Sequence, residues 1–514
     1  MSTEILDLHT FLLDGVHRWS DRPWCSAPDG EATRAEIYAD ALAGAGALRR
    51  RGVTAGDRVA IVQPNGLAFI RAWMAVTLAG AVAVPVNPRA AATELPAVLD
   101  GANPALLIAE PGFEVDGYLL PHTTVAELVA PTLRLPDETT VEVETVVPST
   151  HAAYIQSSGS TGKPKFIIQT HAMYTMAAEG FPFWLGLTER DVLMTSLPLA
   201  HLNAQAYSTL GSWGCGARLV LLPRFSVGTF WQQARDNGAT VVNTIGAMLE
   251  MLMAQPPHPE ERRHELRLCY SAPAPDPVRH VAIEERFGFR LVIGYAQSES
   301  PYGLINAGDD SDARGTMGRP RQHPRLGAVN QARVVDVVTG EELSDGEVGE
   351  LQLRNPATTP GYAGQPEETA LLLRGGWLHT GDLVRRDADG RFSFAGRIKE
   401  LIRRRGENLS PAEVESVLDA HPAVAASAVV GVPSDLSEED IKAFVQLADG
   451  AHATAQTLGA WCAERLPPYK QPRYVEFVTE WPLTETNKIA KARLPRERNT
   501  QETDLARSQT GERA

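Results

Sequence analysis

Short apolar runs alternate with longer, helix-like segments through most of the chain. The run Arg58–Val62 is bounded by Gly56-Asp57 and by Pro64-Asn65-Gly66, and Leu67–Leu78 follows it with helical character. Short buried strands separated by helices are typical of parallel βαβ units. The same pattern predicts another helix at 34–51 and further strands at 81–86, 192–197, 217–222, 240–243, 267–271 and 290–293.

The pattern changes after residue 315. Between 315 and 394, short strands are separated by turns rich in Gly, Asp and Pro, which predicts an antiparallel β region, either a barrel or a small sheet. A helix at 410–419 is then expected, with Ser410 as its N-cap and Pro411 at its first position. Strands at 423–432 and 441–447 and a helix at 455–466 follow.

These elements predict an α/β fold. The large N-terminal domain is expected at 1–396, with parallel βαβ sheets and a small β-barrel-like subdomain at about 315–396. A small, mobile α+β domain is expected at 397–495, followed by a disordered polar tail at 496–514. A length of 514 residues agrees with more than one domain.

Composition and charge narrow the class of partners. Hydrophobic residues make up 43% of the chain and charged residues 22%, which is ordinary for a globular protein. The net charge of −15 argues against a general nucleic-acid or anionic-membrane surface. The four cysteines are far apart, without a CxxC pair, and residues 1–20 lack an apolar signal core, so a reducing cytoplasm is expected.

The most informative segment runs from Tyr154 to Lys165, Tyr-Ile-Gln-Ser-Ser-Gly-Ser-Thr-Gly-Lys-Pro-Lys. Glycines let backbone N–H groups approach an anion, hydroxyls donate to it, and lysines neutralise it. We therefore predict a polyphosphate-binding loop, against the simpler alternative of a solvated surface loop. Its expected ligand residues are Ser157, Ser158, Gly159, Ser160, Thr161, Gly162, Lys163 and Lys165.

This loop is not a Walker A motif. The position five residues before Gly162 is Ser157 where that motif has glycine, and Pro164 follows Lys163 where it has Ser or Thr. Proline also lacks the N–H that a continuing helix would use.

Taken with other motifs, the loop resembles the signature of the acyl-adenylate-forming superfamily, which includes acyl-CoA synthetases. Two local sequences are similar to those of the carnitine/crotonobetaine-CoA ligase branch: Pro198-Leu-Ala-His-Leu-Asn-Ala-Gln205 and Gly406-Glu-Asn-Leu-Ser-Pro411. The remaining matching segments, in the family's order, are Gly52–Asp57, Gly80–Pro85, Gly294–Glu299, Trp377–Asp382, Gly396-Arg397 and Thr484–Lys488.

The resemblance implies ATP and Mg²⁺ as reaction partners. Glu299 would hold the metal ion that bridges the phosphates, and Ser298 would donate to phosphate. Asp382 and Arg397 would contact the ribose, with an ion pair between domains as the alternative. Nucleotide contacts are also implied for Tyr295, Ala274 and Pro275, although Ala272 and Pro273 replace the glycines usual in that turn.

A lysine near the end of the chain carries the catalytic prediction. Lys488 would bridge the carboxylate and the α-phosphate in the transition state. Lys491 is the competing candidate, and Lys399 is implied as the hinge of the smaller domain. His201 would gate or line the acid pocket, unless it is a buried structural histidine. Asn203, Gly294 and Ala296 would line the same pocket, and Gln205 and Tyr207 are further candidates.

The implied reaction activates a small acyl or aryl acid as an acyl-AMP, with release of pyrophosphate, and then transfers it to a thiol. Coenzyme A is the expected acceptor, and a carrier-protein thiol stays open. One alternative keeps the fold but uses nitrite and an aryl amine, as in ATP-dependent diazotases. Another is a non-catalytic AMP-binding protein, against which the presence of Lys488, Glu299, Asp382 and Arg397 argues.

Overall fold

The computed structural model describes residues 4–88, 91–113, 120–129, 145–157, 165–306, 313–404, 407–434, 439–482, 489–497 and 499–508. The chain forms two compact units. Unit 1 comprises Met1–Arg333, Gln352–His379 and Gly390–Phe392, and unit 2 comprises Val334–Leu351, Thr380–Asp389 and Ser393–Ala514. Among the described residues, no helix has the length and apolar character needed to cross a membrane. The mixed α/β architecture confirms the predicted fold class.

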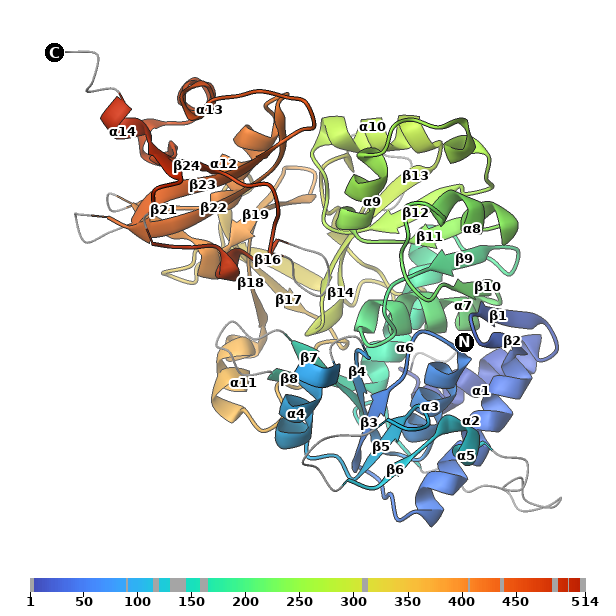
Figure 1. Cartoon of the computed structure of the whole chain (residues 1–514). Coiled ribbons are helices and arrows are strands. Elements are labelled where there is room, and N and C mark those ends of the chain that lie inside the picture. Colours follow the sequence, from blue (N-terminus) through green and yellow to red (C-terminus); the bar gives the residue numbers. More distant parts are fainter. Residues whose placement is uncertain are drawn as a thin grey trace. The chain divides into compact units, whose positions relative to one another are not determined.

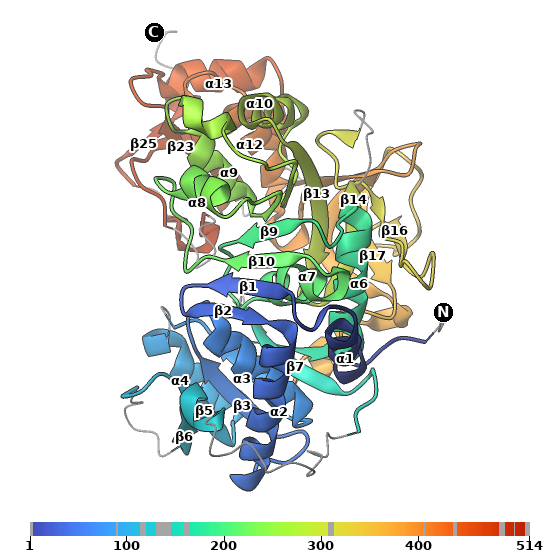
Figure 2. The same cartoon turned by 90° about the vertical axis from the view of Figure 1, so that its right-hand side faces the viewer.

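A nine-stranded sheet forms one half of unit 1 (Figures 1 and 2). Its six central strands are parallel, and antiparallel strands flank them at both edges. The order is β15 (Arg319–Pro320), β14 (Ser300–Asn306), β13 (Arg290–Gln297), β12 (Leu268–Ser271), β11 (Val241–Asn243), β9 (Val192–Thr195), β10 (Arg218–Leu221), β1 (Pro23–Ala27) and β2 (Gly30–Thr33).

A six-stranded sheet forms the other half of unit 1. The strands β3 and β4 were predicted from their apolar runs, and their registered pairing is parallel. The last two strands, β7 and β8, form an antiparallel hairpin. The order is β6 (His122–Thr123), β5 (Leu106–Ala109), β3 (Arg58–Val62), β4 (Val82–Val86), β7 (His151–Ser157) and β8 (Lys165–Thr170).

Helices cover the sheets of unit 1 because neighbouring strand residues face opposite, equally apolar sides. Val241 belongs to the core shared by both sheets, whereas Val242 belongs to the core on the outer face of the larger sheet. The shared core contains α1 (Leu8–Trp19), α2 (Arg34–Arg50), α3 (Leu67–Leu78), α6 (His171–Leu185) and α7 (Leu210–Cys215). The outer cores contain α8 (Phe230–Asp236), α9 (Gly246–Met253) and α10 (Pro277–Phe287) on the larger sheet and α4 (Ala91–Ala102) on the smaller one. Two short helices are α5 (Val125–Leu128) and α11 (Pro366–Leu372).

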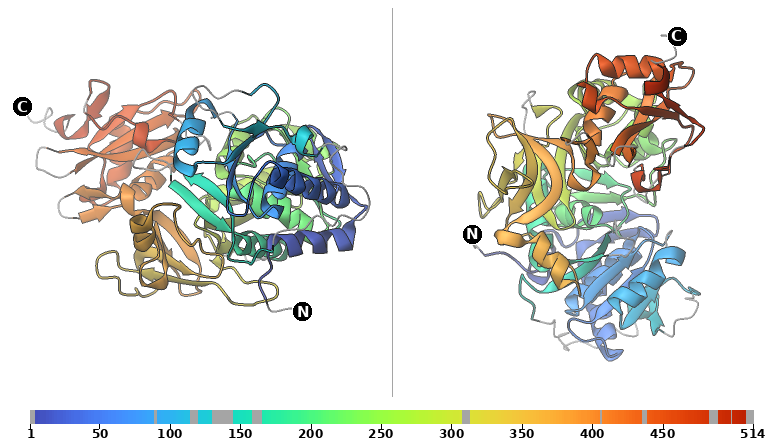
Figure 3. Two further views of the ribbon diagram at one scale, coloured as in Figure 1. Left: turned by 90° about the horizontal axis from the view of Figure 1, so that it is seen from below. Right: turned by 90° about the vertical axis from the view of Figure 1, so that its left-hand side faces the viewer.

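Unit 2 contains the α+β segment that the sequence predicts (Figure 3). The helices α12 (Pro411–Asp419) and α13 (Ala455–Ala463) pack in the core on one face of its four-stranded sheet. The strands of that sheet are β22 (Val424–Pro433), β23 (Glu439–Leu447), β24 (Tyr474–Phe477) and β25 (Glu502–Asp504), and β20 (Ile402–Arg404) pairs with β21 (Glu407–Leu409).

The β-rich region between 315 and 397 forms a further four-stranded sheet. Its order is β16 (Gln331–Val335), β17 (Val348–Arg354), β18 (Leu378–Arg386) and β19 (Phe392–Arg397). The division between the two compact units falls within these strands. The predicted functional boundary at 396/397 stays a prediction.

Two local expectations differ from the structure. Ser410 occupies the N-cap of α12 but makes no capping hydrogen bond. Its Oγ lies beside Gly396, where an added Cβ would be 2.0 Å away. The tail expected to be disordered from 496 includes β25, which pairs with β24, and α14 (Leu505–Ser508). Buried Lys442 holds this segment through Glu502, with 2.7 Å between Nζ and Oε2.

Candidate active site

The predicted phosphate loop joins the two strands of a hairpin. Ser157 is the last residue of β7 and Lys165 the first of β8, and the two are partners in the antiparallel register. The ends of the loop are therefore fixed next to each other. The other predicted ligands, Ser158, Gly159, Ser160, Thr161, Gly162 and Lys163, lie outside the described residues.

A tyrosine that the motifs did not identify connects this hairpin with Glu299. The Nζ atom of Lys165 lies 4.9 Å from the centre of the Tyr362 ring, within cation–π range. The Tyr362 hydroxyl donates a hydrogen bond of 2.9 Å to Oε1 of Glu299. Lys165 and Glu299 thus both contact one tyrosine, an arrangement that suits binding of a metal-bound polyphosphate.

Backbone contacts hold this arrangement in place. The segment before α11 runs beside β8, where Ile168 N–H donates to the Gly361 carbonyl at 3.1 Å. The turn between β13 and β14 is fixed by Gln169, whose Nε2 donates to the Ser298 carbonyl at 2.7 Å. Thr359 N–H donates to the Glu299 carbonyl at 2.8 Å. Three segments distant in sequence therefore position one carboxylate.

The protonation state of Tyr362 agrees with its role as a donor. Burial, and then the nearby Glu299 carboxylate, raise the pKa of this phenol well above its ordinary value. The hydroxyl therefore keeps its proton throughout the physiological range. A single carboxylate supported by a tyrosine is a reasonable protein donor for Mg²⁺, which commonly takes one or two carboxylates together with waters and substrate phosphates.

The predicted nucleotide contacts around β13 lie near this turn in sequence. Tyr295 is buried on β13 and lies against β14, since a Cβ at Gly303 would be 3.0 Å from its ring. Ala296 follows it on the same strand. Ala274 and Pro275 precede α10, and Ala274 packs half-buried against the outer core of the larger sheet.

The predicted acid-pocket residues lie around a π-helix, η2 (Ala204–Thr209). Asn203, just before it, accepts a 2.7 Å hydrogen bond from Nδ2 of Asn243, which also donates to Ser208 at 2.8 Å. Asn243 ends strand β11 and was not identified from the sequence. His201 is half-buried ahead of the same helix. π-Helices are frequently found at functional sites.

The further pocket candidate Gln205 has a structural role in the core. Its side chain is fully buried, accepts a hydrogen bond from Tyr174 and donates one of 2.7 Å to the Leu199 carbonyl. Tyr207 is also buried, beside the Arg321 guanidinium. Gln205 therefore holds η2 in position. The side chains of Tyr207 and Asn203 lie instead beside polar groups at the ends of the strands.

In unit 2, the two predicted ribose ligands contact each other. Nε of Arg397, on β19, lies 3.0 Å from Oδ1 of Asp382, on β18, and Asp382 is only 2% exposed. Within β18, just before Asp382, Gly381 N–H donates to Glu350 at 3.2 Å and Thr380 donates to the Leu351 carbonyl at 2.6 Å.

The structure describes only one of the two candidate catalytic lysines. Lys488 lies outside the described residues. The Nζ atom of Lys491 lies 2.7 Å from Glu415 and 3.4 Å from Glu400, so its charge is already compensated. Lys399, the predicted hinge, lies in the short 3₁₀ turn η6 (Ile398–Glu400).

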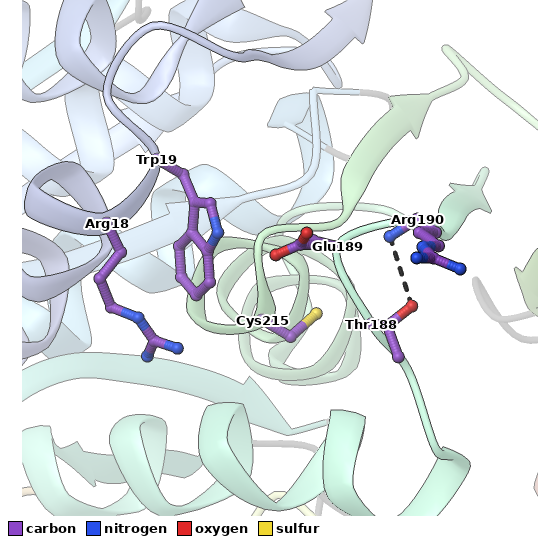
Figure 4. Close-up of a pocket in the computed structure, with 6 residues that line it drawn as sticks. All are labelled: Arg18, Trp19, Thr188, Glu189, Arg190 and Cys215. Atoms are coloured by element: carbon purple, nitrogen blue, oxygen red, sulfur yellow. Dashed lines mark hydrogen bonds between the residues drawn. The ribbon is translucent and has the colours of Figure 1, made fainter.

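A hollow elsewhere on unit 1 contains none of the predicted site residues. Its volume is about 450 Å³, and its lining includes Cys215 at the C-terminal end of α7 (Figure 4). The lining residues are Arg18, Trp19, Thr188, Glu189, Arg190 and Cys215. None of them is predicted to contact ATP or the acid.

Two family models match this chain. The family described as AMP-binding enzyme matches residues 13–363, and its C-terminal domain matches residues 413–488. A crotonobetaine/carnitine–CoA ligase of Salmonella paratyphi B is 32% identical over 472 residues, which cover 86% of this chain and 89% of the relative.

Solved structures of similar fold include two ligases. The o-succinylbenzoate coenzyme A synthetase of Bacillus subtilis, in complex with AMP, has a TM-score of 0.82 at 27% identity, covering 95% of this chain and 98% of that one. A benzoate CoA ligase of Burkholderia xenovorans LB400 has a TM-score of 0.84 at 25% identity, covering 96% and 100%. With both family regions matched in order along the chain, this protein belongs to the AMP-binding enzyme family of acyl-adenylate-forming enzymes.

Proposed function

We propose that this protein is an AMP-forming acid–thiol ligase. It activates a small carboxylic acid with ATP, releases pyrophosphate and transfers the acyl group from acyl-AMP to coenzyme A. The observation that carries this proposal is the contact chain from Lys165 through Tyr362 to Glu299. It joins the end of a phosphate loop to the carboxylate expected to hold a metal ion.

The chemistry explains the need for such a site. A carboxylate must attack the α-phosphate of ATP, and both reactants are anions. Lys165 and the loop before it would bind the polyphosphate, and Glu299, kept in place by Tyr362, would hold Mg²⁺. When bound, Mg²⁺ would neutralise phosphate charge. The ammonium of Lys488 would stabilise charge shared between the acid and the α-phosphate in the transition state.

The second step would require a thiol to reach the adenylate. Coenzyme A is the proposed acceptor because the related ligases are named for it. Candidate acids are those that occur in the names of relatives: carnitine, crotonobetaine, benzoate, o-succinylbenzoate and anthranilate. The nitrite-dependent and non-catalytic alternatives are not favoured by these relatives.

The proposal is tested by pyrophosphate release with these acids, in the wild type and in Lys488→Ala. We expect the variant to lose at least tenfold in rate, or about 1.4 kcal/mol of transition-state stabilisation. Lys491→Ala is the matched control, and we expect a smaller loss because Glu415 and Glu400 already hold that lysine.

Two outcomes would contradict the proposal. An unchanged rate in Lys488→Ala would remove that lysine from the reaction. Pyrophosphate release that requires nitrite and an aryl amine, and not a carboxylic acid, would replace the ligase by a diazotase.

A further inference from the structure

Lys491, the competing candidate for the catalytic lysine, is held by two carboxylates of unit 2. Its Nζ atom lies 2.7 Å from Oε1 and 2.9 Å from Oε2 of Glu415, and 3.4 Å from Oε2 of Glu400. Glu415 belongs to α12, and Glu400 belongs to η6, the turn that contains the predicted hinge residue Lys399. One ammonium group therefore joins three segments: the helix, the hinge turn and the chain that follows Lys488.

The backbone on both sides of this lysine is fixed as well. Ala490 N–H donates to the Pro482 carbonyl at 2.7 Å, so the described parts of the chain before and after residues 483–488 meet at this bond. Ile489 and Leu494 pack in the core on the face of the four-stranded sheet opposite α12. The chain next to the predicted catalytic lysine is therefore anchored by both its backbone and its side chains.

Glu415 is a fixed partner for the ammonium group. Its Oε1 also accepts a 2.6 Å hydrogen bond from Val429 N–H on β22, and its side chain is only 14% exposed. Burial raises the pKa of Glu415, whereas the Lys491 ammonium acts in the opposite direction and favours the charged carboxylate. Because this ion pair is shielded from water, its loss costs more than the loss of a surface ion pair.

We propose that Lys491 is a positioning residue for Lys488: its ion pair with Glu415 fixes the chain three residues after the catalytic ammonium. This inference rests on the proposed function, in which Lys488 stabilises the transition state of adenylate formation. Lys491 itself is assigned no contact with ATP or the acid. Its effect comes through geometry, since displacing a catalytic group by about 1 Å can lower a rate up to about a hundredfold.

The test measures the two half-reactions separately, with the most active acid of the panel above. Lys491→Met keeps most of the length of the side chain but removes its charge. We expect its kcat for pyrophosphate release to fall about fivefold, because the apolar anchors still hold the chain in part. Thioester formation from the isolated acyl-AMP and coenzyme A, a step to which Lys488 is assigned no role, should stay within about twofold of the wild type.

Two further variants test the ion pair. Glu415→Gln keeps the shape of the partner and removes its charge, and we expect the same selective loss in the first step. The double variant with Lys491→Met should lose little more than either single variant, because both changes break one interaction. Lys491→Arg retains the charge and should recover most of kcat. Additive losses in the double variant would overturn the proposal.

Lys470→Met is the matched control for the loss of a lysine ion pair in unit 2. The Nζ atom of Lys470 pairs with Glu413, on the same helix α12, and its side chain is 20% exposed, close to the 22% of Lys491. We expect this variant to keep pyrophosphate release within about twofold of the wild type.

The outcomes separate this inference from the proposed function. Equal losses in both half-reactions for Lys491→Met would mean that the ion pair only stabilises unit 2. A loss in Lys488→Ala without any loss in Lys491→Met or Glu415→Gln would refute this inference alone. An unchanged rate in Lys488→Ala would refute the assigned role of that lysine and this inference with it.

Discussion

At the scale of single residues, the structure adds partners to side chains that the motifs identified. Glu299 and Lys165 belong to recognised motifs, but Tyr362 belongs to none of those identified. Its hydroxyl contacts Glu299 across a sequence separation of 63 residues. Under the proposed function, Tyr362 would be a positioning residue, because it would act on a bound metal ion and phosphate through Glu299 and Lys165.

Replacing Tyr362 with Phe should weaken Mg²⁺ use. The variant loses a hydrogen bond to a charged group. Such a loss costs about 1.5 kcal/mol, which corresponds to roughly tenfold in an equilibrium or rate constant. We expect the Mg²⁺ concentration for half-maximal pyrophosphate release to rise several-fold, while the ring and its contact with Lys165 remain.

Tyr38→Phe is a suitable control, since the Tyr38 hydroxyl contacts His9 at 2.6 Å in the α1–α2 region. An unchanged Mg²⁺ profile in Tyr362→Phe would show that Glu299 does not depend on this tyrosine.

At the scale of elements, periodicity identified most helices and strands correctly. The predicted ranges of β3 and α3 match the structure, and β11 and β12 differ from theirs by one residue at the N-terminal end. Apolar periodicity works here because each element buries one or both faces in a core. It failed for the tail, where β25 is polar, pairs with β24 and forms an ion pair with Lys442 through Glu502.

Glu502→Gln should destabilise unit 2. Lys442 is fully buried, between Glu476 at 2.8 Å and Glu502 at 2.7 Å, and breaking a buried pair leaves a charge less compensated. We expect the free energy of unfolding to fall by about 3 kcal/mol, measured by urea denaturation.

The exposed Glu497, in the same stretch of chain, provides the control Glu497→Gln, for which a change within about 0.5 kcal/mol is expected. Equal stability of the two variants would mean that β25 adds nothing to the unit.

At the scale of the whole molecule, the compact units and the family matches divide the chain at different residues. The family regions end at 363 and resume at 413, whereas unit 2 also includes Val334–Leu351 and Thr380–Asp389. Asp382 and Arg397 therefore belong to one unit, where they form an ion pair. The hinge at Lys399 stays a prediction, because no contact in the structure tests it.

Fixing the backbone at Lys399 should separate the two half-reactions. Proline restricts φ to about −65°, which suits a 3₁₀ turn but limits its reorientation. We expect Lys399→Pro to lower the amount of thioester formed per pyrophosphate released at least tenfold. Lys399→Ala, which leaves the backbone free, should keep the wild-type ratio, and the same ratio in both variants would place the hinge elsewhere.

The sequence alone determined the fold class, the family and the type of reaction. Apolar periodicity and short motifs are relations between neighbours in the chain, so they can be read without coordinates. The contacts of the site residues were decided only by the tertiary structure: Tyr362 with Glu299, Gly294 with Tyr270 and Arg321, and Lys442 with Glu502. These partners are far apart in sequence, and their meeting depends on strand order and packing, which leave no local signal.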